Sequence, residues 1–82
     1  MNATMARGMR EITPEEANIT AQRAQRWQDF LADADVKFVF LGGTTYDYSL
    51  WAVRYPDGSA HIWRTPHDPC GRYVKAECRP WN

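Results

Sequence analysis

The stretch "WAVRYPDGSAHIWR", residues 51–64, predicts two antiparallel strands joined by a tight turn. Pro56 suits the first central position of a type I turn, and Asp57 suits the second. Gly58 then suits the left-handed conformation that closes such a turn with a bulge. Together they predict a hairpin with a three-residue loop, since a proline cannot donate to the strand ladder.

The loop length decides which side chains share a face of the hairpin. It pairs Tyr55 with Ser59, and it sets two tryptophans opposite each other. The face that carries the tryptophans comprises Trp51, Val53, Tyr55, His61 and Trp63. The opposite face comprises Leu50, Ala52, Arg54, Ala60, Ile62 and Arg64.

A single helix over 13–34 is predicted upstream of the hairpin. Thr13, Pro14 and Glu16 match a capping box with proline at the first helical position. Apolar side chains then recur at helical spacing and form a stripe of Ala17, Ala21, Ala24, Trp27 and Leu31, flanked by Ile19, Phe30 and Ala34. Residues 1–11, by contrast, are expected to be a loose arm.

The rest of the sheet is predicted from runs of β-branched and aromatic residues. Strands are expected over 36–41, 49–55 and 59–65, and the first of these is apolar on both faces, which is typical of a central or covered strand. The stretch "RYVKAEC", residues 72–78, alternates well enough to be a fourth strand at an edge. The predicted fold class is α+β, with one N-terminal helix packed on an antiparallel meander of three to four strands, in a single domain over 1–82.

Composition narrows the class of protein. The chain has 82 residues and a formal net charge of zero, so we expect one small domain that is not, as a whole, a binder of polyanions. No stretch has the apolar length of a membrane span, and the opening "MNATMARGMR" lacks the apolar run of a secretory signal. The expected location is the cytoplasm.

The face that carries the tryptophans is the first candidate binding surface. One helix covers one face of a sheet, and the small aliphatic side chains opposite complement an alanine-rich helix. If the helix packs there, it leaves an open aromatic surface beside arginines, a composition typical of protein-binding surfaces. The candidate binding residues are Trp51, Tyr55, His61 and Trp63 on this face, with Arg54 and Arg64 beside them on the same two strands. If the helix packs on the tryptophans instead, these rings are the core that a small domain needs.

The acidic end of the helix is the second candidate surface. Asp29 and Asp33 are four residues apart and share a helical face, and Asp35 follows. Together they suit a basic partner, while the alternative is a solvated helix end.

The histidines and cysteines raise three chemical alternatives. A zinc site from His61, His67, Cys70 and Cys78 is conceivable, but the spacing lacks the paired C-x2-C knuckle. A Cys70–Cys78 disulfide fits the loop length, but a cytoplasmic chain keeps such thiols reduced. A catalytic pair of Cys70 or Cys78 with His61 or His67, oriented by Asp68 or Glu77, requires these groups to meet in space. His67-Asp68 is expected instead to cap or hydrogen-bond within its loop. No cofactor and no catalytic residue is predicted.

These observations predict a non-enzymatic module that binds a larger protein or protein complex. In size and character alone, the chain resembles the small inhibitors of host complexes that phages and mobile elements encode, anti-CRISPR proteins among them. A single-stranded nucleic-acid binder that uses Trp51, Trp63 and Arg64 is the alternative, because aromatic platforms flanked by arginine stack bases. A small zinc-stabilised domain is the third hypothesis.

Overall fold

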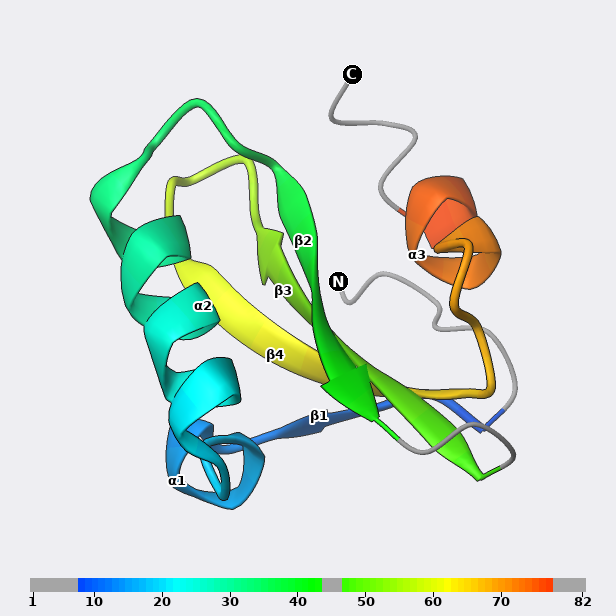
Figure 1. Ribbon diagram of the computed structural model, residues 1–82. Helices are drawn as coiled ribbons and strands as arrows, with labels where there is room; N and C mark the ends of the chain where they lie inside the picture. The colour runs from blue at the N-terminus through cyan, green and yellow to red at the C-terminus, as the bar shows by residue number, and fades with distance from the viewer. Residues whose placement is uncertain (1–7, 44–46, 78–82) are drawn as a thin grey trace.

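Four strands and three helices make up the part of the chain that the computed structural model describes, residues 8–43 and 47–77 (Figure 1). In chain order the elements are β1 (Arg10–Ile12), α1 (Pro14–Ala17), α2 (Ala21–Ala32), β2 (Phe38–Gly43), β3 (Tyr48–Arg54), β4 (Ala60–Pro66) and α3 (Arg72–Glu77). The strands are antiparallel and lie in one sheet in the order β1-β4-β3-β2. The class is mixed α+β with an antiparallel sheet, as predicted. None of these helices is long and apolar enough to span a membrane.

The predicted hairpin and its register are confirmed. Trp51 pairs with Trp63 across β3 and β4. The N–H of Tyr55 donates to the Ser59 carbonyl (2.9 Å), and the N–H of Gly58 donates to the Tyr55 carbonyl (2.9 Å). Gly58 has a φ of +90°, which glycine adopts without steric cost. The turn residues therefore set the pairing along both strands.

The single helix expected over 13–34 is wrong, because the structure has two helices there. The capping box at Thr13 forms as predicted, but α1 has only 4 residues. Thr20 then caps α2 by accepting a hydrogen bond from the N–H of Arg23 (3.2 Å). The break lets Ala17 in α1 and the buried side of α2 reach the same core.

The fourth strand expected over 72–78 is also wrong, and α3 takes its place. The carboxylate of Asp68 accepts hydrogen bonds from the N–H groups of Arg72 (2.7 Å) and Tyr73 (3.0 Å). The first N–H groups of a helix have no partner within it, so Asp68 caps α3. The capping expected of His67-Asp68 is carried out by the aspartate, and it favours a helix where the alternation favoured a strand.

The edge position belongs to β1 instead. This strand pairs with residues 62–64 of β4. It begins inside the stretch 1–11 that was expected to be a loose arm, of which residues 1–7 lie outside the described chain. A strand of 3 residues is too short for alternation to be recognised, so periodicity could not reveal it.

The other strands lie close to their predicted positions. β3 and β4 are each shifted by one residue from 49–55 and 59–65, and β2 is shifted by two from 36–41. The register of β2 against β3 shifts between Phe40 and Gly42. Leu41 is the extra residue of this β-bulge, and Gly42 and Gly43, which were expected to turn the chain, continue the pairing with Leu50 and Ser49.

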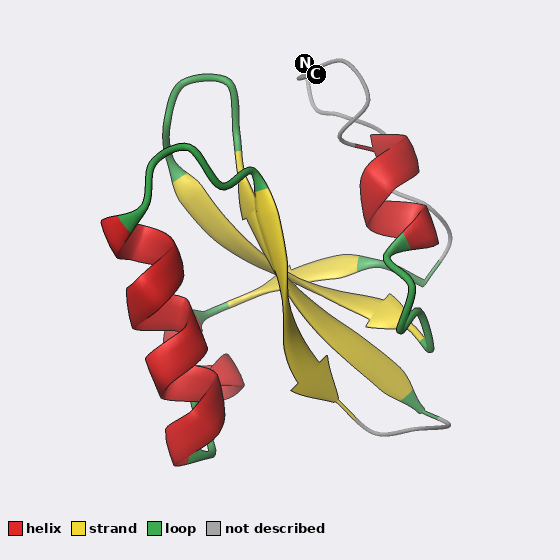
Figure 2. Cartoon of the chain, turned by 45° about the horizontal axis from the view of Figure 1, so that its top comes forward, coloured by secondary structure: helices red, strands yellow, loops and turns green. Residues whose placement is uncertain are grey.

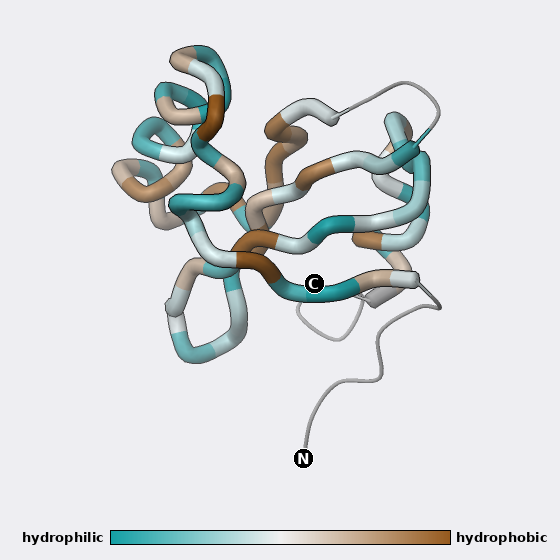
Figure 3. Tube along the Cα trace, turned by 90° about the horizontal axis from the view of Figure 1, so that it is seen from below, coloured by the Kyte–Doolittle hydropathy of each residue, from teal (hydrophilic) through white to brown (hydrophobic). Residues whose placement is uncertain are grey.

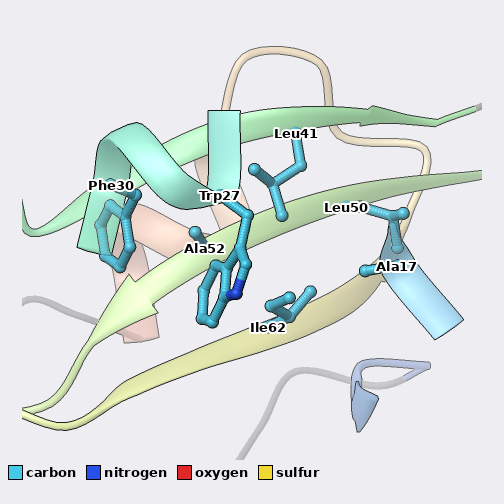
Figure 4. Packing of buried hydrophobic residues seen from close by; sticks show 7 residues of the cluster. All are labelled: Ala17, Trp27, Phe30, Leu41, Leu50, Ala52 and Ile62. Carbon is cyan, nitrogen blue, oxygen red and sulfur yellow. The ribbon is translucent and has the colours of Figure 1, made fainter. Parts of the chain in front are cut away.

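The α2 face of the sheet carries the first core (Figure 4). Its buried members are Ala17, Trp27, Phe30, Leu41, Leu50, Ala52 and Ile62. The rings of Trp27 and Phe30 stack with their centres 5.9 Å apart. Along the coil of α2, hydrophilic and hydrophobic residues alternate (Figure 3), as one packed face requires. The alanine-rich helix thus packs on the small aliphatic face of the hairpin.

The opposite face carries a second core, because α2 and α3 lie on opposite sides of the sheet (Figure 2). Its buried members are Met9, Trp51, Val53, Trp63 and Val74, with Phe38, Phe40 and Tyr55 packed against them. Met9 precedes β1 and Val74 lies in α3. One N-terminal helix on one face is therefore not the arrangement of this chain, whose sheet is covered on both sides.

Candidate binding surfaces

The predicted aromatic surface is buried. Trp51 is 7% exposed and Trp63 is 1% exposed. The indole N–H of Trp51 donates to the Asp68 carbonyl (3.1 Å), and a Cβ on Gly71 would come within 2.6 Å of the same ring. The indole N–H of Trp63 donates to the Tyr55 hydroxyl (3.1 Å). Both indoles hold the fold together and offer no open platform to a protein or to bases.

Arg54 and Arg64 lie on the face opposite the tryptophans, as the hairpin register predicts, and so do not border the rings. Arg54 is 6% exposed. Its Nη2 donates to the Phe30 carbonyl (2.6 Å) and its Nε donates to the Val36 carbonyl (3.3 Å), at and just beyond the C-terminal end of α2. The Phe30 carbonyl also accepts a hydrogen bond from the N–H of Asp33 (3.3 Å), and the buried cation adds to the stability of this end of α2. Arg64 lies on the α2 face, with its guanidinium 4.7 Å from the centre of the Tyr48 ring.

A chain of hydrogen bonds joins the edge strand β1 to the hairpin turn. Glu11 Oε2 lies 2.9 Å from His61 Nδ1, and His61 Nε2 lies 2.8 Å from Ser59 Oγ. The same hydroxyl lies 2.6 Å from Asp57 Oδ1. Tyr55 stacks on His61 with ring centres 3.8 Å apart and donates to Glu11 Oε1 (3.0 Å). We call this array the clasp; it brings together two members of the predicted surface through a glutamate that sequence reasoning missed.

The clasp has the order of groups found in a catalytic triad, so its protons decide what it can do. A serine hydroxyl carries one hydrogen, and 2.6 Å from the Asp57 carboxylate it donates there. The two ring nitrogens of His61 bridge Ser59 and Glu11, and which of them donates depends on the tautomer of the ring. The Ser59 hydroxyl donates to Asp57, so its proton is not directed at His61 as it would be in an activated nucleophile. In this arrangement the clasp joins β1 to the turn.

Asp57 has a pKa below the ordinary value of an aspartate. The side-chain hydrogen bond from Ser59 is the largest cause, followed by the hydrogen bond from the Ser59 backbone N–H. That N–H lies 2.8 Å from Asp57 Oδ1. The charge of His61 lowers the pKa further. An ionised Asp57 is what the clasp requires of its last member.

The histidines and cysteines are not gathered into a metal site in the described residues. Residues 8–43 and 47–77 hold no group of three or more His, Cys, Asp or Glu side chains that could hold a metal ion. Cys70 is exposed and free, and Cys78 lies outside those ranges. His61 is held in the clasp and Asp68 caps α3, so neither orients Cys70 as a nucleophile.

A pocket of about 220 Å³ lies between α2 and β2. We call it the α2–β2 groove; it is lined by Arg26, Asp29, Phe30, Asp33, Val36 and Val39. Asp29 and Asp33, both predicted, are exposed at its rim, whereas Asp35 does not line it. The groove therefore combines an apolar wall with two carboxylates and one guanidinium.

The groove runs beside β2, which is an edge strand of the sheet in the described part of the chain. The N–H of Arg54 donates to the Lys37 carbonyl (2.8 Å), so the backbone groups of Lys37 and Val39 face β3. By the alternation of an antiparallel ladder, the N–H and C=O groups of Phe38 and Phe40 point away from β3. Within residues 8–43 and 47–77, no strand lies on that side of β2.

Sequence reasoning found the acidic rim of this site and missed its wall and edge. A strand that is apolar on both faces predicts a central or covered position, yet β2 lies at the edge of the sheet. Strand order depends on which strands pair, and local pattern does not contain that information. The available signal is weak: residues 36–41 carry only Lys37 as a charge, and a charge is one of the devices that protect an edge.

No family model, curated protein or solved structure matches the chain. A functional assignment therefore depends on the geometry of the clasp, the α2–β2 groove and the strand edge.

Proposed function

We propose that this chain is a non-enzymatic protein-binding domain whose partner adds an extended basic segment to the edge of β2. The observation that carries the proposal is the α2–β2 groove beside outward-facing backbone groups. Strand addition takes its affinity from main-chain hydrogen bonds and its specificity from pockets for alternate side chains. Both features meet along β2.

The groove favours a particular kind of side chain. Phe30 and Val39 provide an apolar wall, and Asp29 and Asp33 place two carboxylates at the rim, against the single cation of Arg26. A lysine or arginine suits this lining, because its apolar stem packs on the wall while its charged end stays with the carboxylates. The preferred partner segment therefore alternates, with a basic residue directed toward α2.

The opposite edge of the sheet is a poorer surface for pairing. β1 has 3 residues, and Arg10 and Glu11 are both exposed. Short, charged edge strands resist pairing with other chains. β2 has 6 residues, and its apolar Phe38 and Phe40 present their backbone groups outward. The contrast supports β2 as the docking edge.

Inhibition of a larger complex is the finer form of this proposal. A domain that occupies a basic segment of its partner competes with whatever that segment binds. The cytoplasm is the proposed place of this encounter. The support is the small size of the chain together with a groove-and-edge surface suited to blocking. The comparison with phage and mobile-element inhibitors extends no further than size and character.

A capture experiment with matched charge variants tests the proposal. The wild type, Asp29→Lys and Asp35→Lys serve as baits in a nuclease-treated lysate of the source cells. Both variants carry the same change of charge, but only Asp29 lines the groove. We expect a protein that the wild type and Asp35→Lys retain and that Asp29→Lys loses. The same proteins on all three baits, or nucleic acid without protein, would contradict the proposal.

A synthetic peptide gives a more direct probe. An alternating threonine–lysine peptide is titrated into ¹⁵N-labelled protein, and the amide signals of Phe38 and Phe40 are followed. We expect these signals to shift, and a matched threonine–glutamate peptide to bind at least about tenfold more weakly, since the carboxylates at the rim repel it. Equal binding of the two peptides, or shifts confined to other strands, would argue against the groove.

A further inference from the structure

A second pocket lies on the α2 face of the sheet, apart from the α2–β2 groove. Its volume is about 280 Å³. Its lining comprises Arg10, Ile12, Glu16, Tyr48, Leu50 and Arg64. None of these residues belongs to α2 or lines the groove. The pocket is therefore a separate site, built by β1, β3, β4 and the short helix α1.

Two arginines face each other in this pocket. Arg10 and Arg64 are direct partners in the β1–β4 ladder, so their side chains share one face of the sheet. Like charges directly opposite each other destabilise an antiparallel pair. Among residues 8–43 and 47–77, the ion pair is between Glu11 and His61, so neither arginine has a carboxylate within ion-pair distance. An anion between them would remove the repulsion.

The one acid in the lining has another partner. Glu16 Oε1 accepts hydrogen bonds from the N–H (3.2 Å) and the hydroxyl (3.3 Å) of Thr13, in the capping box of α1. This pair holds the carboxylate at the start of the helix. Among the described residues no ion pair joins Glu16 to either guanidinium, so the lining carries two positive charges against one negative charge.

The Tyr48 ring orients one of the two cations. The guanidinium carbon of Arg64 lies 4.7 Å from the centre of that ring. A cation over a ring is attracted by the ring face without using its N–H groups, which stay available to a ligand. Ile12 and Leu50 add apolar surface to the same lining.

We propose that Arg10 and Arg64 together bind the phosphoryl group of a small ligand. A tetrahedral dianion offers acceptors to two guanidinium forks at once and cancels their repulsion. The volume, about 280 Å³, lies just below the usual range of sites for drug-sized molecules, which restricts the ligand to inorganic phosphate or a small phosphomonoester. This inference requires neither the α2–β2 groove nor a protein partner.

Thermal unfolding of charge variants tests this inference. Arg10→Gln removes one of the paired cations, and Arg72→Gln is the matched control on the exposed side of α3. In sodium chloride we expect Arg10→Gln to unfold at a higher temperature than the wild type, because the repulsion is gone. In sodium phosphate of equal ionic strength, we expect the wild type and Arg72→Gln to gain stability and Arg10→Gln to gain almost none. An equal gain by all three proteins would show a general ion effect and overturn the inference.

A titration followed by NMR locates the ligand and identifies its source. Inorganic phosphate or O-phosphoserine is added at constant ionic strength while the Nε–H signals of the arginines are recorded. We expect Arg10 and Arg64 to shift together, and Arg64→Gln to weaken binding by at least about tenfold. If O-phosphoserine binds more tightly than phosphate, the ligand is a phosphomonoester. If phosphate binds more tightly, the ligand is the free ion. If neither Arg10 nor Arg64 shifts, or if the arginines outside the pocket shift as much as these two, the inference is overturned.

Discussion

Arg54 joins the C-terminal end of α2 to the centre of the sheet. Its two hydrogen bonds end on carbonyls of Phe30 and Val36, and its guanidinium lies 4.4 Å from the Phe30 ring centre. We expect Arg54→Met to lower the free energy of unfolding by about 2–3 kcal/mol, because buried carbonyls lose a charged donor. Urea denaturation measures the change. Arg54→Lys should recover only part of the loss, since it keeps the charge and lacks the fork; a loss under about 0.5 kcal/mol for Arg54→Met would contradict this role.

Asp57 gives the turn a dependence on pH. Folding lowers its pKa through the hydrogen bonds from Ser59, so the ionised carboxylate contributes stability above the unfolded pKa. That contribution is lost as the pH falls through the folded pKa. We expect the wild type to be more stable than Asp57→Asn near neutral pH, and the difference to shrink as the pH falls below about 4. Urea denaturation at a series of pH values checks this, and a difference that stays constant with pH would count against the clasp.

Among the helices and strands, sequence patterns correctly predicted the features that depend on residues close together in the chain. The hairpin register follows from Pro56, Asp57 and Gly58, which lie next to one another, and it is confirmed. β1 depends on pairing with residues about fifty positions later in the chain, and no local pattern reports such a contact. α3 depends on Asp68, whose carboxylate selects a helix over a stretch that also alternates. The missed elements are the ones whose stability comes from distant or capping contacts.

Two glycines test how α3 is held against the sheet. Gly71 has a φ of +69°, and a Cβ there would lie 2.6 Å from the Trp51 ring; Gly58 has a φ of +90° with nothing within 4 Å. Gly58→Ala should therefore cost only the backbone strain, about 1 kcal/mol. Gly71→Ala should cost about 2–4 kcal/mol, because the clash with the ring is added. Chemical denaturation of both variants compares them, and equal losses would mean that Trp51 does not pack on Gly71.

The α2–β2 groove also combines a feature that local sequence determines with features that depend on distant contacts. Asp29 and Asp33 share a helical face by spacing alone, and the structure places both at the rim of the α2–β2 groove. The groove itself exists only because α2 packs against β2 and β2 lies at an edge. Those are properties of the assembled sheet. The acidic rim could therefore be predicted from the sequence, whereas the docking edge could not.

At the scale of the whole molecule, the sheet is covered on both faces by a very short chain. With a single helix, packing α2 on the aliphatic face would leave the tryptophans exposed. In the structure they are buried. Met9 and Val74 close the second face from the two ends of the described chain. Large rings are well suited to this task, since a small domain buries less of its surface than a large one. With both faces covered, we expect the proposed partner at an edge of the sheet.

Hydrogen exchange of the tryptophan indoles tests this two-sided arrangement most directly. The N–H of Trp51 donates to the Asp68 carbonyl and that of Trp63 donates to the Tyr55 hydroxyl, both within the second core. We therefore expect their NMR signals to exchange with deuterium at least about 10³-fold more slowly than an exposed indole, as groups released by global unfolding do. If both indoles of the folded protein exchange at the rate of an exposed indole, the tryptophans are exposed to solvent and the sheet is not covered on both faces.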